Sequence, residues 1–220
     1  MSKEFAIITA GGKGTRMDSE VPKQFMDLNG LPVIMHAIRA FTSFSPDINI
    51  ILVLPKDGMD EWDHILKMYP LDIEFNLCTG GETRFDSVKN GLELVEGNGL
   101  VAIHDAVRPL ISKKLIADCF LAASTEGNAI PVIPVQDSMR ELSGEHCRPA
   151  RREAFRLVQT PQVFDIALIK KAYEQGYRSS FTDDATVVEA LGARINLVEG
   201  EKKNIKITTR EDLLIAKALL

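Results

Sequence analysis

Glycines and cations gather in a loop directly after the first apolar run of the chain. The run is "FAIIT" (residues 5–9), and "AGGKGTRM" (residues 10–17) follows it. Because glycine has no side chain, the backbone N–H groups of such a loop can approach phosphate oxygens closely. Arg16 lies at the end of the loop, and Lys23 follows in "PKQF". We expect these two cations to clamp a triphosphate around a turn formed by Gly11, Gly12 and Gly14.

Two common phosphate-binding motifs do not fit this loop. A P-loop requires Ser or Thr after its Gly-Lys pair, whereas Gly14 follows Lys13 here. A dinucleotide fingerprint requires a third glycine where Met17 stands, and an acid after the second strand, where Pro55 stands. The loop therefore predicts phosphate binding of another kind.

Two further loops with unusual composition follow predicted strands. "TGGETR" (79–84) leads into a helix whose first N–H groups suit an anion or the polar edge of a base; a simple helix cap is the alternative. "HDAVRP" (104–109) places Asp105 at the end of an apolar run, where a carboxylate facing phosphates is a candidate Mg²⁺ ligand. Arg108 could instead pair structurally with Asp105, and we expect His104 to be a packed histidine rather than a catalyst.

The elements that must position these loops alternate between short apolar runs and amphipathic segments. Buried strands are predicted at 5–9, 48–54, 73–77, 100–104, 129–135, 194–198 and 204–208. Helices are predicted around 34–41, 85–95, 115–120, 165–177, 184–191 and from the capping box "TRED" (209–212) onward. The alternation predicts right-handed crossovers and a mostly parallel sheet, whose strand carboxyl ends would carry all three loops.

Residues 136–160 interrupt this alternation. The segment carries five arginines and four acids with few large apolar residues, so it cannot bury much core of its own. Ser143 and Gly144 predict the turn of a hairpin. Two interpretations stay open here: an exposed surface excursion, or an arm that docks on a second subunit.

Composition excludes several classes of function. The net charge of −5 argues against a broad nucleic-acid surface. No apolar stretch approaches the roughly 20 residues of a membrane helix, and the N-terminus lacks a signal-peptide pattern. The three cysteines are far apart and form no CxxC pair, which disfavours a disulfide scaffold or structural zinc. We expect a cytoplasmic protein that binds neither nucleic acid nor membranes.

Six motifs occur in order and together resemble one enzyme family. They are "AGGKGTRM…PKQF", "TGGETRFDSV", "HDAVRP", "TPQVF", "TDDATVVE" and "NIKIT". This set is similar to the cytidylyltransferases of the non-mevalonate isoprenoid pathway, which join CTP to 2-C-methyl-D-erythritol 4-phosphate and release pyrophosphate. The resemblance runs from about residue 4 to 218. It implies a single α/β domain over residues 1–220, with a Rossmann-like nucleotidyltransferase fold, helices on both faces of the sheet and a protruding β-arm.

The resemblance also implies roles for individual residues. Arg16 and Lys23 would be catalytic, stabilising the pentavalent phosphorus and the departing pyrophosphate, while Asp105 would hold Mg²⁺ or another divalent cation. The nucleotide would be lined by Ala10, Gly11, Gly12, Gly14, Gly81, Glu82, Ser87, Asp105 and Ala106. The sugar-alcohol phosphate would be positioned by Ser138, Arg152, Thr160, Thr182 and Lys206.

In this family, the segment at 136–160 is an arm that reaches the other subunit of a homodimer, so Arg152 would complete the partner's site. Two alternatives remain. Ribitol-5-phosphate cytidylyltransferases share most of the motifs, but the link between their "RM" and "PKQ" elements tends to be one residue longer than "DSEV" here. The other alternative is a non-catalytic nucleotide-binding protein, which would not need all of Arg16, Lys23, Asp105 and Lys206.

Overall fold

The computed structural model describes residues 3–10, 21–144 and 146–220. The predicted nucleotide ligands Gly11, Gly12 and Gly14, and the predicted catalytic Arg16, lie outside the described residues. Within the described ranges, none of the helices is both long and apolar enough to cross a membrane.

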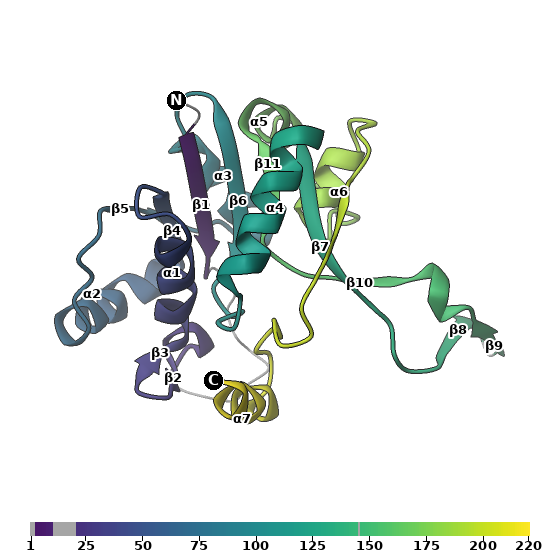
Figure 1. Cartoon of the computed structure of the whole chain (residues 1–220), viewed down its shortest axis with the longest axis horizontal. Helices are drawn as coiled ribbons and strands as arrows, with labels where there is room; N and C mark the ends of the chain where they lie inside the picture. The colour runs from purple at the N-terminus through teal and green to yellow at the C-terminus, as the bar shows by residue number, and fades with distance from the viewer. Residues whose placement is uncertain (1–2, 11–20, 145) are drawn as a thin grey trace.

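A mixed eight-stranded sheet runs through the molecule (Figure 1). Its main path is β10 (Arg156–Val158), β7 (Asn128–Pro134), β11 (Gln162–Asp165), β6 (Gly99–Asp105), β1 (Lys3–Thr9), β4 (Asn49–Leu54) and β5 (Phe75–Thr79), with β12 (Leu197–Glu199) beside β7. Strands β6, β1, β4 and β5 are parallel, whereas β11 lies antiparallel between β6 and β7. The predicted α/β class is confirmed, with a larger antiparallel share than the sequence indicated.

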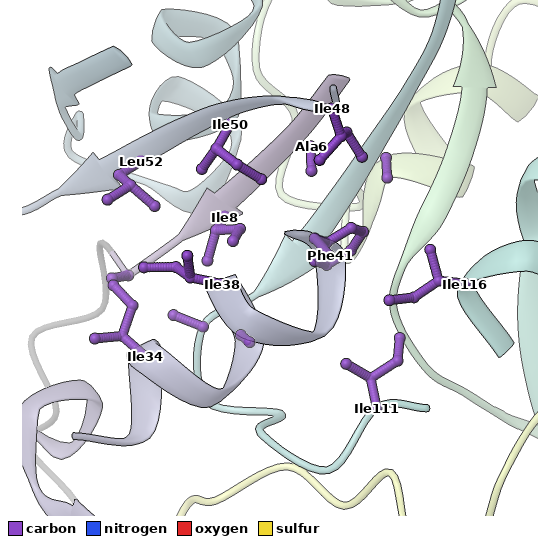
Figure 2. Close-up of a cluster of buried hydrophobic side chains, with 14 of the residues drawn as sticks. Ala6, Ile8, Ile34, Ile38, Phe41, Ile48, Ile50, Leu52, Ile111 and Ile116 are labelled. Atoms are coloured by element: carbon purple, nitrogen blue, oxygen red, sulfur yellow. The ribbon is translucent and has the colours of Figure 1, made fainter. Parts of the chain in front are cut away.

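Helices cover both faces of this sheet because side chains alternate along the buried strands. Ala6 and Ile8 of β1 face a core formed with α1 (Val33–Phe44), α2 (Met59–Met68) and α4 (Lys113–Glu126) (Figure 2). Phe5 and Ile7 face a second core formed with α3 (Arg84–Glu93), α5 (Ile166–Tyr173) and α6 (Asp184–Glu189). With both faces buried, the strands read as continuous apolar runs, which explains why the sequence revealed them.

Smaller elements close the carboxyl-end edge of the sheet. They are a 3-10 turn η1 (Lys23–Phe25), the short strands β2 (Asp27–Leu28) and β3 (Leu31–Pro32), a turn η2 (Lys56–Gly58) and the last helix, α7 (Arg210–Leu219). Ile207 and Ala216 are fully buried against Leu28 and Val107 in a third cluster. The C-terminal part of the chain is thereby held beside the loop that follows β6.

The predicted hairpin is present and projects away from the sheet (Figure 1). Strands β8 (Met139–Ser143) and β9 (His146–Ala150) pair antiparallel, with Ser143 opposite His146, and the turn η3 (Arg152–Ala154) leads back to β10. Leu142 is 77% exposed on this arm, so the hairpin contributes little to the core of its own chain.

Several predicted boundaries were wrong. Residues 204–208 do not form a strand, because the backbone N–H of Ile207 donates to the loop carbonyl of Val107 rather than to a ladder. The helix expected at 165–177 ends at Tyr173, and the strand expected at 194–198 is only β12. Strands β10 and β11 were not predicted.

Candidate functional site

Three strand ends bring the predicted loops together. Thr9 pairs with Val53 on one side and with Asp105 on the other, so β1, β4 and β6 end at the same level. The backbone then extends these ladders, because Ala10 N–H donates to Val53 O (2.8 Å) and Ala106 N–H donates to Thr9 O (2.9 Å). Ala10 and Asp105 therefore flank one edge, as expected for a ligand site at strand carboxyl ends.

A cavity of about 1030 Å³ opens at this edge. Seven of the residues predicted from the sequence line it: Ala10, Lys23, Gly81, Glu82, Ser87, Asp105 and Lys206. These residues are far apart in the sequence, from Ala10 to Lys206, and the topology of the sheet brings them close together in space. The cavity has room for a nucleotide.

The loop between β5 and α3 forms one wall of the cavity and is held by its own side chains. Thr83 and Asp86 make a reciprocal capping box at the start of α3. Ser87 Oγ accepts a hydrogen bond from Gly81 N–H (3.1 Å) and donates to Thr83 O (2.9 Å). A side chain at position 81 would place its Cβ only 2.3 Å from Asp86 Cβ, so this close turn requires glycine. The predicted helix cap is confirmed, and binding of an anion or a base edge by the same loop stays a prediction.

A buried carboxylate surrounded by cations lies on the floor of the cavity. Asp105 is 6% exposed; its Oδ2 lies 2.8 Å from Lys206 Nζ and 3.5 Å from Arg108 Nε, and its Oδ1 lies 3.5 Å from Arg84 Nε. Burial alone would raise the pKa of Asp105, but Arg84, Lys206 and Arg108 outweigh it and hold that pKa well below its usual range. The carboxylate is therefore ionised and fixes three cations beside the cavity.

Arg84, which the sequence did not single out, is clamped from behind. Its Nη1 and Nη2 donate to the two oxygens of Asp184, at 2.9 and 2.7 Å. Asp184 is fully buried at the start of α6 and also accepts the hydroxyl of Tyr173 at 2.6 Å. A bidentate pair of this kind fixes the plane of a guanidinium. The second acid of "TDDA" was the available signal, but its partner lies 100 residues away.

His104 and Thr160 support Asp105 through hydrogen bonds. Thr160 Oγ1 accepts the backbone N–H of Asp105 (3.1 Å) and lies 3.0 Å from His104 Nδ1, while His104 Nε2 lies 3.1 Å from Arg108 O. Because a carbonyl can only accept, Nε2 carries the proton, and Nδ1 accepts the hydroxyl of Thr160. Burial lowers the pKa of His104 to about 4, which keeps the ring neutral. His104 is a packed histidine, as predicted.

Four predicted substrate-positioning residues do not line the cavity. Thr160 is buried behind Asp105, and Thr182 is exposed before α6. Ser138 and Arg152 are exposed on the arm, where Arg152 Nη1 donates to Gln136 O. Within one described chain, only Lys206 of the five predicted acceptor-side residues therefore reaches the cavity.

The residues present fit a Mg²⁺ ion shared with substrate. The described part of the chain contains no group of three or more His, Cys, Asp or Glu side chains arranged to hold a metal. Mg²⁺, however, commonly uses one or two carboxylates and completes its shell with water and phosphate oxygens. Asp105 supplies one carboxylate, and its Oδ1 lies 3.5 Å from Arg84, beyond ordinary hydrogen-bond length.

Comparisons with known proteins agree with one another. Residues 5–220 match the family model described as IspD, 2-C-methyl-D-erythritol 4-phosphate cytidylyltransferase. A relative of that name from Bacteroides fragilis is 52% identical over 215 residues, covering 98% of each chain. The crystal structure of the Thermus thermophilus protein of that name superposes with a TM-score of 0.80 at 36% identity, covering 100% of this chain and 98% of that one. The 4-diphosphocytidyl-2C-methyl-D-erythritol synthase from Anaerococcus prevotii gives a TM-score of 0.84 at 29% identity, covering 99% and 98%.

Proposed function

Because the chain belongs to the 2-C-methyl-D-erythritol 4-phosphate cytidylyltransferase family, we propose that the cavity at the ends of β1 and β6 binds CTP and the phosphate of the acceptor. The chain is a transferase of the non-mevalonate isoprenoid pathway, and it transfers the CMP group of CTP to 2-C-methyl-D-erythritol 4-phosphate with release of pyrophosphate. The gathering of Lys23, Gly81, Asp105 and Lys206 around one cavity carries the proposal for the site.

In the reaction, a phosphate oxygen of the acceptor attacks the α-phosphorus of CTP. A new bond forms between that oxygen and the α-phosphorus. The bond between the α-phosphorus and the oxygen that bridges it to the β-phosphorus breaks, and pyrophosphate leaves with that electron pair. The attacking phosphate is already ionised at neutral pH, so positioning and charge neutralisation supply the catalysis. We assign that neutralisation to Lys23, which lines the cavity, and by family resemblance to Arg16.

The charge cluster around Asp105 suits two anionic substrates. Asp105 and Asp184 are the two carboxylates that face Arg84, Arg108 and Lys206, so this cluster keeps one net positive charge at the cavity floor. Asp105 would both hold these cations in place and contribute a ligand to Mg²⁺. When bound, Mg²⁺ supplies further neutralisation of the phosphates. Lys206 is oriented by Asp105 and is our candidate for the acceptor phosphate.

We propose that the arm at residues 136–160 joins two chains into a homodimer. Its base carries Phe155, Leu157 and Val158, residues that are 47%, 53% and 41% exposed in the single chain. Arg152 lies on the same exposed segment, so a second subunit could receive it in its own cavity. Free thiols at Cys78, Cys119 and Cys147 agree with the reducing cytoplasm that we propose for the protein.

Pyrophosphate release from CTP and Mg²⁺ tests the proposed site. We expect release with methylerythritol phosphate, and none with ribitol 5-phosphate or without acceptor. Lys23→Ala should reduce kcat by on the order of 10²–10³, as the loss of an oxyanion-hole donor does. Lys202→Ala is the matched control, because Lys202 is exposed and outside the cavity lining. Equal losses in both variants would contradict the assignment, and CTP binding without release for any acceptor would indicate a nucleotide-binding protein.

The arm is tested by subunit exchange. Lys23→Ala and Arg152→Ala proteins should each be nearly inactive when alone. After mixing and exchange, a heterodimer has one site with both residues intact if Arg152 acts across the interface. Recovery of activity would support the shared site, and no recovery despite measured exchange would contradict it.

A further inference from the structure

Gln24 lies between the core and the cavity. It lies in η1, where Phe25 N–H donates to Pro22 O at 2.8 Å and Phe25 is 6% exposed in the cluster around α1. Gln24 itself is 1% exposed and lines the cavity beside Lys23. The backbone at Gln24 is therefore fixed by the hydrogen bond of the turn and by the packing of Phe25, whereas no described hydrogen bond holds the side-chain amide nitrogen.

The amide nitrogen of Gln24 is buried without a hydrogen-bond partner among the described residues. Leaving a buried donor unpaired costs stability, and native proteins rarely retain such groups without a reason. Of the side-chain atoms that are buried and unpartnered in the described ranges, this is the one whose residue lines the cavity. Because the nitrogen itself has almost no accessible surface, the side chain must turn toward the cavity for an acceptor on the ligand to reach it.

We propose that Gln24 is a substrate-contacting residue whose Nε2 donates to a phosphate oxygen of bound CTP. Phosphate is the acceptor that its surroundings favour, because Lys23 precedes it in the same turn and Lys206 and Arg84 line the same cavity. A neutral amide beside these cations would donate a directional hydrogen bond to phosphate without adding charge to the site. The inference rests on the proposed function of the cavity and deepens it.

The test replaces the amide without changing the volume of the side chain greatly. Gln24→Met removes the donor and the buried unpaired group together. We expect its unfolding midpoint in urea to equal or exceed that of the wild type, while its Kd for CTP rises about ten- to a hundred-fold, as for a lost hydrogen bond to a charged group. Gln24→Glu should bind CTP more weakly still, because it places a carboxylate against the triphosphate. Inhibition by cytidine, which has no phosphate, should change little.

Gln162 provides a matched control away from the cavity. It is also 1% exposed, but its amide is paired: Nε2 donates to Asp183 Oδ2 (2.8 Å) and Oε1 accepts Ala185 N–H (2.9 Å). Gln162→Met should therefore lower the unfolding midpoint, which is the opposite of the effect at Gln24. The two glutamines have similar burial and differ in whether the protein itself satisfies them.

Three results would overturn the proposal. The first is that Gln24→Met is as destabilised as Gln162→Met, and the second is that Gln24→Met binds CTP with unchanged affinity. The third is that its inhibition by cytidine weakens by the same factor as its affinity for CTP. Affinity is measured by calorimetry with CTP alone, independently of turnover. If the wild-type protein binds CTP but releases no pyrophosphate, the proposed function is contradicted. The test of Gln24 can still be interpreted in that case, because it compares CTP affinities and does not depend on turnover.

Discussion

Acid should destabilise the wild-type protein more than a His104→Gln variant, because His104 is buried in its neutral form. The ring is fully buried, with Thr160 Oγ1 3.0 Å from Nδ1 and Arg108 O 3.1 Å from Nε2. Burial lowers its pKa from 6.5 to about 4. In the unfolded chain the ring therefore takes up a proton below about pH 6.5, whereas in the folded chain it does so only below about pH 4. The free energy of unfolding is highest above this pH range and falls as the pH drops through it.

The size of the effect follows from these two pKa values. At about pH 4.5, the linkage relation gives a loss of about 2.5 kcal/mol in the free energy of unfolding from this ring. Glutamine retains a donor and an acceptor but has no titrating ring. The His104→Gln variant should therefore lose less free energy of unfolding between about pH 7.5 and about pH 4.5 than the wild type does, by about this amount.

Urea unfolding at the two pH values measures this difference. All samples are compared at one protein concentration, since a dimer would make stability depend on concentration. His146→Gln serves as the control, because His146 is exposed on the arm; it should keep the acid sensitivity of the wild type. If His104→Gln loses as much stability on acidification as the wild type, the buried neutral ring is not a source of the acid sensitivity.

Three further perturbations address the site. Asp184→Asn removes the charge that pairs with Arg84 and should lower the free energy of unfolding in urea by about 3–5 kcal/mol. Tyr173→Phe, which removes only one hydrogen bond to Asp184, should lower it by about 1 kcal/mol. Equal losses in the two variants would contradict the role of this ion pair. Gly81→Ala should raise KM for CTP by on the order of ten- to a hundred-fold, because its Cβ would lie 2.3 Å from a helix side chain; an unchanged KM would show that the loop yields freely. Lys206→Met removes a cation that lowers the pKa of Asp105, so the pKa of this carboxyl, followed by NMR, should rise; an unchanged pKa would refute that coupling.

Much of the fold could be predicted because both faces of the parallel strands are buried. Strands such as β1 and β4 then appear as uninterrupted apolar runs, and the helices between them show apolar stripes. Strand β11 could not be predicted in the same way, since it has four residues and its place is decided by the partners it finds. Residues 204–208 show the converse, because an apolar alternation packs against α7 without joining a sheet.

The site was predictable where chemistry lies in local motifs and unpredictable where it depends on distant pairs. Lys23 and Asp105 each stand in a motif, and the structure places both at the cavity. Arg84, which flanks Asp105, pairs with Asp184 from 100 residues away, and the second acid of "TDDA" gave no indication of which residue would be its partner. Gln24 was overlooked because only burial reveals that its amide is unpaired.

The late position of β11 has a consequence for the chain as it is made. Strand β11 enters the sheet between β6 and β7, both of which are synthesised before it. Until residues 162–165 emerge from the ribosome, β6 therefore has an unpaired edge, the kind of edge that invites pairing with another chain. Lys206 emerges after the last strand of the sheet has been completed at Glu199. In chain order, Lys206, whose ammonium group lies 2.8 Å from Asp105, therefore follows every strand of the sheet.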